Sequence, residues 1–484
     1  MDMARVVVVG AGMGGMAAAA RLAVAGHEVV VHERTGTYGG AVRQYARDGF
    51  VFDTGPGLLQ LPAVYRDLFV KTGRERLEDV VELVQVPVTA RHVFADGSAV
   101  TLPDASRGKV IAALDDALGE GAGERWSAML TRARTAWETT RRPLLEEPLR
   151  AEPSSRDLLA ADGAYPALRP KGLLRLSRVL RGLGTAAPAL AEVARDELRD
   201  PRLAAMLCGS VWTQGLDPAT SPASAAALAY VEDTFGTWYV RGGLRALADA
   251  LHARCRARGV AFRFDSPVAG VREKDGRAAG VELADGSAVD AEVVVASGGP
   301  AAPGGQGSAD RGMSRLTVLL ALRGARPAGT PHRTLVHRAE APGQPLTVLR
   351  PDDPALRPDD AHETAVLTLP VPGGLPAEAA QPLAESLLAT TDAAGLGLRE
   401  RVLWREVRSP AAIEAETGAP GGRVPPPGLS GGGGAFLHPA NATGLPGLYA
   451  AGGWSHPGGG LPAAGMTGAM VAGLVQDPEW RGSV

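Results

Sequence analysis

The hydrophobic and polar positions at the start of the chain follow a strand, helix, strand pattern. Val6–Val9 is a short continuous apolar run, as a buried parallel strand would be. Met16–Ala25 is rich in alanine and favours a helix, which Gly26 is placed to end. His27–His32 then predicts a second strand. Residues 4–34 therefore predict a β-α-β unit.

Two later parts of the chain return to the same alternation. Residues 240–300 predict one helix at Gly243–Arg258 and three strands at Val260–Phe264, Val268–Arg272 and Ala291–Ala296. Two hairpin turns are also expected, at Lys274–Arg277 and Asp285–Gly286. The C-terminal part predicts a strand at Gly447–Ala451 and a helix at Ala463–Val475. We therefore predict one discontinuous α/β domain made of residues 1–98, 236–300 and 435–484.

The residues between those segments predict a second domain. Residues 99–233 look mostly helical, with Pro and Gly breaks, whereas residues 314–408 alternate strand-like runs with one helix near 376–392. The strand-like runs include Leu316–Leu322 and Thr364–Leu369. Residues 299–312 and 417–434 are rich in Gly and Pro and are expected to be loops. Residues 99–235 and 301–434 are therefore expected to form an inserted α+β domain that binds the substrate.

Composition narrows the class of protein. A chain of 484 residues is too long for one ordinary core. A net charge of -3 and 5% aromatic residues favour no nucleic-acid partner. Cys208 and Cys255 lack metal-ligand spacing, and the histidines form no HxxxH pattern, so no metal site is expected. Both cysteines are expected to be reduced thiols of a cytoplasmic protein. Glycines interrupt the apolar N-terminal run, so we expect neither a signal peptide nor a spanning helix.

A glycine motif joins the first strand to the first helix. Gly10, Gly12, Gly14 and Gly15 form GxGxxG, in which the glycines allow a tight turn, close approach of a pyrophosphate and close helix packing. The N–H groups of the helix N-terminus would face the phosphates. Glu33 ends the second strand, where a carboxylate can bind a ribose hydroxyl. A strand, helix, second strand and acidic residue in register predict a dinucleotide site.

A second glycine pair distinguishes FAD from a nicotinamide cofactor. Arg34 is followed by Gly39, Gly40 and Arg43, which resembles the extension in glutathione-reductase-like and amine-oxidase-like FAD proteins. That resemblance implies that these residues hold phosphate and ribityl groups. Because no cysteine lies near the C-terminal glycine-rich turn, non-covalent FAD is expected.

Four stretches of the chain resemble the bacterial carotenoid desaturases, the phytoene and hydroxyneurosporene desaturases. They are the N-terminal glycine motifs, FDTGP at residues 52–56, GTWYVRGG at residues 236–243, and GLYAAGG with HPGGGLP at residues 447–462. The resemblance implies an α/β fold, namely a glutathione-reductase-like (Rossmann-type) FAD domain with an inserted α+β substrate domain. It also implies further cofactor contacts at Gly55, Pro56, Val268, Gly452, Gly453, Gly460, Leu461 and Pro462.

Candidate catalytic residues are few, because the flavin itself accepts the hydride in this family. Tyr239, Arg241, Trp454 and His456 are expected on the substrate side of the ring, with His456 as a candidate general base. The alternative for His456 is a structural role in the glycine-rich turn, and for Trp454 a packing role. Asp53 is expected to cap a turn rather than to act as an acid or base.

Three functions follow from this pattern. The leading hypothesis is an FAD-dependent desaturase that introduces C=C bonds into an isoprenoid or polyene by hydride transfer to flavin N5. The alternative is a flavin oxidase or dehydrogenase that acts on a C–N bond or a polar secondary metabolite, favoured by the Ala-, Arg- and Pro-rich middle domain. Two residues depart from the family pattern and also bear on the substrate. His438 stands where the family commonly has Arg, and Trp454 is bulky where a small residue is usual. A lipid-binding escort would have lost the flavin glycines, which are intact here.

The expected partner is a small apolar molecule. Lys171–Leu183 has apolar residues at helical spacing among several cations, which predicts either a membrane-surface helix or an ordinary helix with a solvated face. A cytoplasmic protein is therefore expected, with peripheral membrane contact left open.

Overall fold

The computed structural model describes residues 3–103, 106–150, 153–166, 168, 188–299 and 312–482. The predicted loop at 299–312 lies almost entirely outside these residues, and so does the predicted basic helix at Lys171–Leu183.

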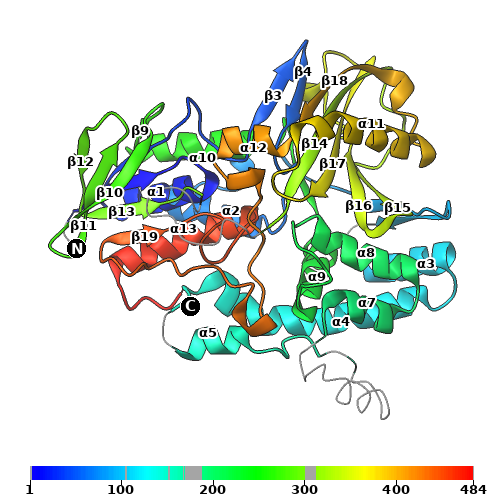
Figure 1. The fold of residues 1–484 in the computed structure, drawn as a ribbon, viewed down its shortest axis with the longest axis horizontal. Helices are drawn as coiled ribbons and strands as arrows, with labels where there is room; N and C mark the ends of the chain where they lie inside the picture. The colour runs from blue at the N-terminus through cyan, green and yellow to red at the C-terminus, as the bar shows by residue number, and fades with distance from the viewer. Residues whose placement is uncertain are drawn as a thin grey trace.

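A parallel five-stranded sheet lies at one end of the molecule (Figure 1). Its order is β19-β13-β1-β2-β9, made of Leu448–Ala450, Val293–Ala296, Arg5–Val9, Glu28–His32 and Ala261–Arg263. Val6, Val8, Val29, Val31 and Val295 are buried, because helices cover the sheet as parallel strands require. The three predicted segments of α/β pattern therefore meet in one sheet.

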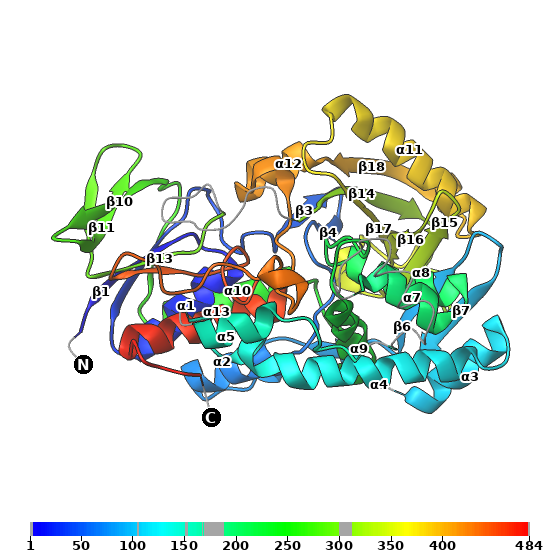
Figure 2. The same ribbon diagram turned by 60° about the horizontal axis from the view of Figure 1, so that its bottom comes forward.

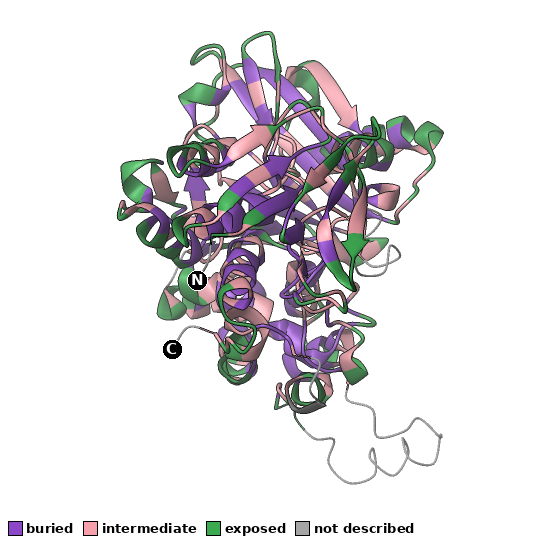
Figure 3. Cartoon of the chain, turned by 90° about the vertical axis from the view of Figure 1, so that its left-hand side faces the viewer, coloured by how far each residue is buried: buried purple, intermediate pink, exposed green. Residues whose placement is uncertain are grey.

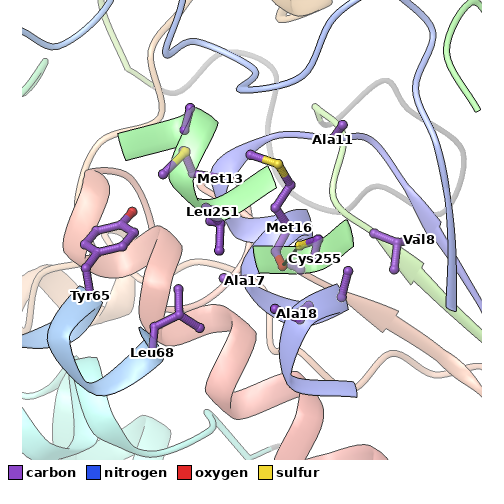
Figure 4. Packing of buried hydrophobic residues seen from close by; sticks show 14 of the residues in the cluster. Val8, Ala11, Met13, Met16, Ala17, Ala18, Tyr65, Leu68, Leu251 and Cys255 are labelled. Carbon is purple, nitrogen blue, oxygen red and sulfur yellow. Dashed lines mark hydrogen bonds between the residues drawn. The ribbon is translucent and has the colours of Figure 1, made fainter. Parts of the chain in front are cut away.

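Four helices pack beside this sheet: α1 (Met13–Val24), α2 (Ala63–Gly73), α10 (Arg245–Ala257) and α13 (Leu461–Gln476). Small residues bring α1 and α13 together, since a Cβ added to Gly468 would lie 2.6 Å from the carbonyl carbon of Ala17. Figure 4 shows the alanines of α1 beside Leu251 and Cys255 of α10 and Tyr65 and Leu68 of α2. The alanine run that predicted a helix is therefore also its packing surface.

Two predicted hairpins form a three-stranded antiparallel sheet. It contains β10 (Val268–Lys274), β11 (Arg277–Leu283) and β12 (Ala288–Asp290). Lys274 pairs with Arg277 across the first turn, and the second turn holds Asp285 and Gly286 as predicted. Helix α1 begins at Met13, three residues before the predicted start, because Gly14 and Gly15 of the turn already have helical geometry. Helix α13 begins at Leu461, two residues before the predicted start, because Gly460 caps it.

A larger sheet forms the second half of the molecule. Its order is β18-β14-β17-β16-β15-β6-β7, made of Val402–Arg408, Ser314–Arg323, His362–Val371, Ala341–Leu349, Arg333–Arg338, Val88–Val93 and Ala99–Pro103. Helix α11 (Ala377–Ala393) packs on one face. Strand β6 pairs in parallel with β15, so residues 88–93 join this sheet although the sequence pattern assigned them to the first domain. Arg91 of β6 pairs with Thr334 of β15, 243 residues further along the chain, so local pattern gave no sign of this pairing.

A helical bundle packs against the larger sheet (Figures 1 and 2). It contains α3 (Arg107–Leu118), α4 (Ala122–Arg141), α7 (Leu190–Leu198), α8 (Pro201–Trp212) and α9 (Ala226–Phe235), which share one apolar core. Helix α5 (Pro153–Ala160) and helix α12 (Pro410–Thr417) lie outside it. Where the structure describes residues 99–233, that is outside 104–105, 151–152, 167 and 169–187, their predicted mostly helical character is confirmed, except for β7.

Short elements complete the chain. Two-stranded sheets pair β3 (Gln44–Arg47) with β4 (Phe50–Asp53) and β5 (Leu83–Gln85) with β8 (Trp238–Val240). Short helical turns lie at Leu77–Asp79, Arg142–Glu146, Ala223–Ala225, Pro354–Leu356, Arg399–Arg401, Pro420–Gly422 and Gly432–Gly434. Figure 3 shows buried residues concentrated in the sheets and in the helix faces that cover them.

Candidate functional site

The turn between β1 and α1 exposes free backbone donors. Gly10 has φ +100° and donates its N–H to the His32 carbonyl, 2.8 Å away. Gly12 caps α1 without a side-chain hydrogen bond, and the first turn contains no acidic residue. The first N–H groups of α1 are therefore available to an anion at the positive end of the helix dipole.

The remaining glycines of this motif are required by packing. A Cβ on Gly14 would lie 2.8 Å from Gly452 Cα, and one on Gly15 would lie 2.3 Å from the Gly10 carbonyl oxygen. Ser297, directly after β13, lies against both Gly15 and Gly452. Its hydroxyl is buried and has no hydrogen-bond partner among the described residues. The carboxyl ends of β1, β13 and β19 therefore meet around a polar atom with unused hydrogen-bonding capacity.

Glu33 lies at the end of β2, where the sequence placed it. Its carboxylate is buried and accepts hydrogen bonds from Ala11 N at 2.8 Å and from Thr35 N and Oγ1, both at 2.9 Å. A carboxylate has about four acceptor sites, so one remains for a ribose hydroxyl. Ser266 N donates to the Glu33 carbonyl at 2.9 Å, so Val268 at the start of β10 lies two residues beyond a direct contact with the Glu33 backbone.

The second glycine pair lies directly against the first motif. Gly39 N donates to the Ala11 carbonyl at 2.8 Å, and a Cβ on Gly40 would lie 3.0 Å from Gly12 Cα. Arg43 donates to the Gly40 carbonyl at 2.8 Å and to the Glu416 carbonyl at 3.1 Å. Arg34 donates to the Ala415 carbonyl at 2.9 Å. The two arginines thus bind the end of α12, a contact that the sequence pattern did not predict.

A pocket of about 280 Å³ adjoins the second glycine pair, lined by Thr37, Arg43, Gln44, Arg245 and Glu416. Burial lowers the pKa of Arg43. The Glu416 and Glu33 carboxylates oppose that shift, and the nearby cations Arg34 and Arg245 add to it. A group of cations beside free helix N–H groups favours a phosphate.

Asp53 and Gly55 shape the loop beside this pocket. Asp53 accepts from Leu244 N at 2.8 Å, so it binds the start of α10, 191 residues further along the chain, and not the local turn that the sequence predicted. Burial raises its pKa to about 7, although backbone donors at Leu244 and Arg245 act in the opposite direction. A Cβ on Gly55 would lie 1.9 Å from the Ala41 carbonyl oxygen, so only glycine fits there, and Pro56 follows it.

The C-terminal glycine-rich turn is packed under a proline-rich segment. Gly459 N donates to the Pro426 carbonyl at 2.8 Å, and Gly428 N donates to the Pro457 carbonyl at 3.0 Å. A Cβ on Gly453 would lie 2.5 Å from the Pro425 ring. Helix α13 begins at Leu461 and Pro462, after Gly460 at φ +99°, with no side-chain cap and no acidic residue in its first turn. This turn offers a second free helix N-terminus.

His456 and Trp454 lie in that turn, and both are buried. His456 Nε2 lies 2.9 Å from the Glu147 carbonyl oxygen, which only accepts, so the ring donates there. Burial lowers its pKa to about 4, with the nearby His438 contributing in the same direction and the Glu147 hydrogen bond opposing it. His456 is therefore neutral at pH 7. His438 itself contacts the Pro426 carbonyl at 2.9 Å.

Tyr239 lies on β8, and Arg241 directly follows that strand. Tyr239 is buried and donates to the Asp353 carboxylate at 2.7 Å, and Arg241 donates to the Asp352 carbonyl at 2.9 Å. Burial and the Asp353 hydrogen bond raise the pKa of Tyr239. Across the described ranges, no hydrogen bond or ring contact joins this pair to Trp454 or His456.

These donors together fit FAD. The uncapped N-terminus of α1, the buried Glu33 carboxylate with a spare acceptor site and the unpartnered Ser297 hydroxyl lie at the carboxyl edge of the parallel sheet. The two glycine turns meet there at backbone distances that side chains would block, and the second turn leads to the uncapped N-terminus of α13. Sequence reasoning missed Ser297, Thr35 and α12. Only Ser297 had a signal, since it directly follows a buried strand whose carboxyl end borders the glycine motif.

Comparisons with known proteins agree with this geometry. The family of flavin-containing amine oxidoreductases matches residues 13–306. This chain belongs to that family. It is an FAD-dependent oxidoreductase, as the glycine motifs predicted.

Individual relatives cover the chain to different extents. The chain is 31% identical over 302 residues to a 4,4'-diapolycopene oxygenase of Methylomonas sp. The match covers 61% of this chain and 56% of the relative, so the chain spans about half of that protein's length. It is 30% identical over 509 residues to a hydroxyneurosporene desaturase of Cereibacter sphaeroides, 97% of this chain and 96% of the relative. A putrescine oxidase structure shares the fold, with a TM-score of 0.64 and 15% identity, over 98% of this chain and 99% of that one.

Three further properties concern only the residues that the structure describes. No helix among the described residues is both long enough and apolar enough to cross a bilayer. The same residues contain no group of three or more His, Cys, Asp or Glu side chains placed to hold a metal ion. Cys208 and Cys255 are both free thiols.

Proposed function

We propose that this chain is an FAD-dependent desaturase that introduces C=C bonds into an apolar polyene. The observation that carries the proposal is the end-to-end similarity to a hydroxyneurosporene desaturase, which includes both the flavin side and the substrate side of the chain. The putrescine oxidase has the same fold at 15% identity, so that likeness supports the fold and not C–N oxidation.

FAD supplies the hydride acceptor when bound, and the protein places it. For the cofactor contacts we propose the residues that the sequence indicated: Gly10, Gly12, Gly14, Gly15, Glu33, Arg34, Gly39, Gly40, Arg43, Gly55, Pro56, Val268, Gly452, Gly453, Gly460, Leu461 and Pro462. Glu33 would hold the ribose, and the N-terminus of α1 would bind the pyrophosphate. The uncapped N-terminus of α13 would stabilise negative charge on the ring system.

His456 has the geometry of a positioning residue. It is neutral, and its Nε2 hydrogen is used by the Glu147 carbonyl. That bond joins the glycine-rich turn to the segment that follows α4. Trp454 would pack beside the turn and exclude water from it. Tyr239 and Arg241 would set the wall of the substrate side by their bonds to Asp353 and Asp352.

The domain division follows the same proposal. Residues 1–98, 236–300 and 435–484 would form the FAD-binding unit, and residues 99–235 and 301–434 the substrate-binding unit, with β6 crossing from the first to the sheet of the second. An apolar substrate that dissolves in lipid favours peripheral contact with a membrane surface, and the sequence of Lys171–Leu183 supports it. Sedimentation with anionic lipid vesicles tests that contact, and no sedimentation with them would contradict it.

The central experiment is anaerobic flavin reduction. The FAD-loaded protein is mixed with neurosporene in detergent, and separately with a panel of amines that includes putrescine. We expect the polyene to bleach the oxidised flavin band and to form a product that absorbs at longer wavelength, because one more conjugated C=C bond forms. Bleaching by amines alone would overturn the proposal.

A further inference from the structure

The larger sheet has one face covered by a helix and a second face turned toward the first domain. Figure 2 shows α11 over the first face, where the even-numbered residues of β14 pack in its core: Leu316, Val318, Leu320 and Leu322. Odd-numbered residues lie on the opposite face, because side chains alternate along a strand. There Leu319 and Ala321 pack with Phe50 and Phe52 of β4. We call this second side the inner face of the sheet.

The inner face stays partly exposed in the middle of the sheet. The strand register places five half-buried residues on it: Arg315, Thr347, Leu349, Val366 and Thr368. The matching residues on the α11 face are at most 4% exposed: Leu346, Val348, Leu367 and Leu369. Strands β14, β17 and β16 are interior strands of the seven-stranded order, so this exposure belongs to the face and not to an open edge. The inner face is therefore accessible where these five residues lie.

Arg315 places a cation on the inner face without a counter-charge. Its Nη2 donates to the Thr213 carbonyl at 3.1 Å, and no carboxylate among the described residues forms an ion pair with it. Burial lowers the pKa of Arg315, and no carboxylate in the described part of the chain opposes that shift. Two other arginines on this face do have carboxylate partners: Arg333 pairs with Glu232, and Arg408 pairs with Glu416.

The end of α8 compensates this charge only in part. Thr213 is the C-cap of α8, and a helix C-terminus carries roughly half a negative charge. The contact uses one of the five N–H donors of the guanidinium. The remaining donors form a planar fork, which fits the two oxygens of a carboxylate. A charge that stays buried without a partner destabilises the fold, so an arriving anion would be bound favourably.

The start of β14 also lies close to the turn proposed to hold the flavin ring. Val424 N donates to the carbonyl of Met313, two residues before Arg315, at 2.9 Å. A Cβ on Gly453, in the C-terminal glycine-rich turn, would lie 2.5 Å from the ring of the adjoining Pro425. Arg315 therefore lies at the end of the inner face that is linked to the flavin-side turn by two consecutive contacts.

We propose that Arg315 determines specificity by binding a carboxylate group of the substrate. The guanidinium fork meets the two carboxylate oxygens, and the ligand supplies the counter-charge that the chain lacks. The inference rests on the proposed desaturase function and narrows its substrate to an unsaturated chain that carries an acid group. The same cation repels an ammonium group, so it disfavours amines as substrates of this face.

Two polyenes that differ only in charge test the subsite. The FAD-loaded protein is titrated anaerobically at about pH 8 with retinoic acid, which is ionised, and with its neutral methyl ester. Binding is followed by the absorption of the polyene, while the flavin band reports any oxidation of the ligand. We expect the acid to bind roughly tenfold more tightly than the ester, because only the acid forms charge-assisted hydrogen bonds with Arg315. Equal affinities would overturn the subsite.

Variants separate recognition of the ligand from a structural role at the end of α8. Arg315→Gln can still donate to the Thr213 carbonyl but is neutral, so the acid should lose its roughly tenfold advantage while the ester binds as before. Arg315→Lys keeps the charge without the fork and should retain part of the advantage. Arg323→Gln, at the exposed far end of β14, is the matched control and should retain all of it. An equal loss for acid and ester in Arg315→Gln would contradict the proposal.

Reduced flavin is a second source of negative charge, and its midpoint potential distinguishes the two. A lower potential in Arg315→Gln with an unchanged preference for the acid would assign the cation to the flavin and overturn the subsite. Failure of the desaturase function is also distinguishable. Selective binding of the acid without flavin reduction by any polyene would contradict that function and leave the subsite standing. Flavin reduction by neurosporene with equal affinities for acid and ester would contradict the subsite alone.

Discussion

At the scale of single residues, the charge state of a buried group decides what it can do. Glu33 is buried beside three donors, so its carboxylate is satisfied and rigid before a cofactor arrives. His456 is buried beside a carbonyl oxygen and a second histidine, so it stays neutral. The arrangement of Glu33 suits a group that binds the cofactor, and the arrangement of His456 suits a structural link between two segments.

Replacing Glu33 by Gln should weaken FAD binding by roughly 10–100-fold. The amide has nearly the same shape but loses a charge-assisted hydrogen bond to the ribose. Flavin release, followed by the recovery of free flavin fluorescence on dilution, measures the change. Glu28→Gln, on the exposed start of β2, is the control and should bind FAD as the unaltered protein does. Unchanged affinity in Glu33→Gln would remove this residue from the site.

Stability should fall as the pH falls from about 6.5 to about 4, in part because of His456. The unfolded chain takes up a proton near the ordinary pKa of 6.5, whereas the folded protein does so only near 4, so protons favour unfolding in that window. In His456→Gln the amide can still donate to Glu147 but does not titrate. Between pH 8 and pH 5 the unaltered protein should therefore lose roughly 2 kcal/mol more unfolding free energy than the variant. Urea unfolding at both pH values measures this, and equal losses would show that His456 is not the buried neutral group described.

At the scale of elements, close backbone approach between α1 and the C-terminal segment builds the flavin edge. Gly14 meets Gly452, and Ala17 meets Gly468, so two chain segments more than 400 residues apart touch without side chains between them. Such contacts hold the first turn of α1 against the segment that leads from β19 into α13.

Gly14→Ala and Gly12→Ala should therefore behave differently. A Cβ at residue 14 would lie 2.8 Å from Gly452 Cα and must push backbone aside, which should lower the unfolding free energy of the FAD-free protein by about 1–3 kcal/mol. A Cβ at residue 12 has its first neighbour at 3.9 Å, so that protein should stay within about 1 kcal/mol. Gly12→Ala should instead lose FAD affinity, because the methyl group occupies the approach of the pyrophosphate. Urea unfolding and FAD titration of both variants check this, and a destabilised Gly12→Ala with intact FAD affinity would contradict it.

At the scale of the whole molecule, buried ion pairs join the bundle to the larger sheet. Arg333 on β15 and Glu232 on α9 are both largely buried and pair across that boundary. Arg350 and Arg401 share Glu363 inside the sheet in the same way, at 2.7 and 2.8 Å. The Arg333–Glu232 pair makes the placement of the bundle depend on that of the sheet, because a separated partner would leave a buried charge alone, whereas the two pairs of Glu363 link segments of the sheet.

Glu232→Gln should cost about 3–5 kcal/mol of unfolding free energy, since it leaves the Arg333 cation buried without its counter-charge. Glu138→Gln removes an exposed partner of Arg134 on α4 and should cost less than about 1 kcal/mol. Chemical unfolding followed by circular dichroism measures both. Similar small losses in the two variants would show that the Arg333–Glu232 pair does not join the layers energetically.

The sequence by itself determined the chemistry of the cofactor edge. Glycines at 10, 12, 14 and 15, the acidic residue at 33 and the pair at 39 and 40 are local requirements of tight turns and close approach, and local pattern carries them. Strands and helices such as Val6–Val9 and Ala463–Val475 were predicted for the same reason. Only the tertiary structure placed β6 beside β15, brought Arg34 and Arg43 to α12, and paired Tyr239 with Asp353 and His456 with Glu147. Those outcomes depend on partners hundreds of residues away, which no local pattern encodes.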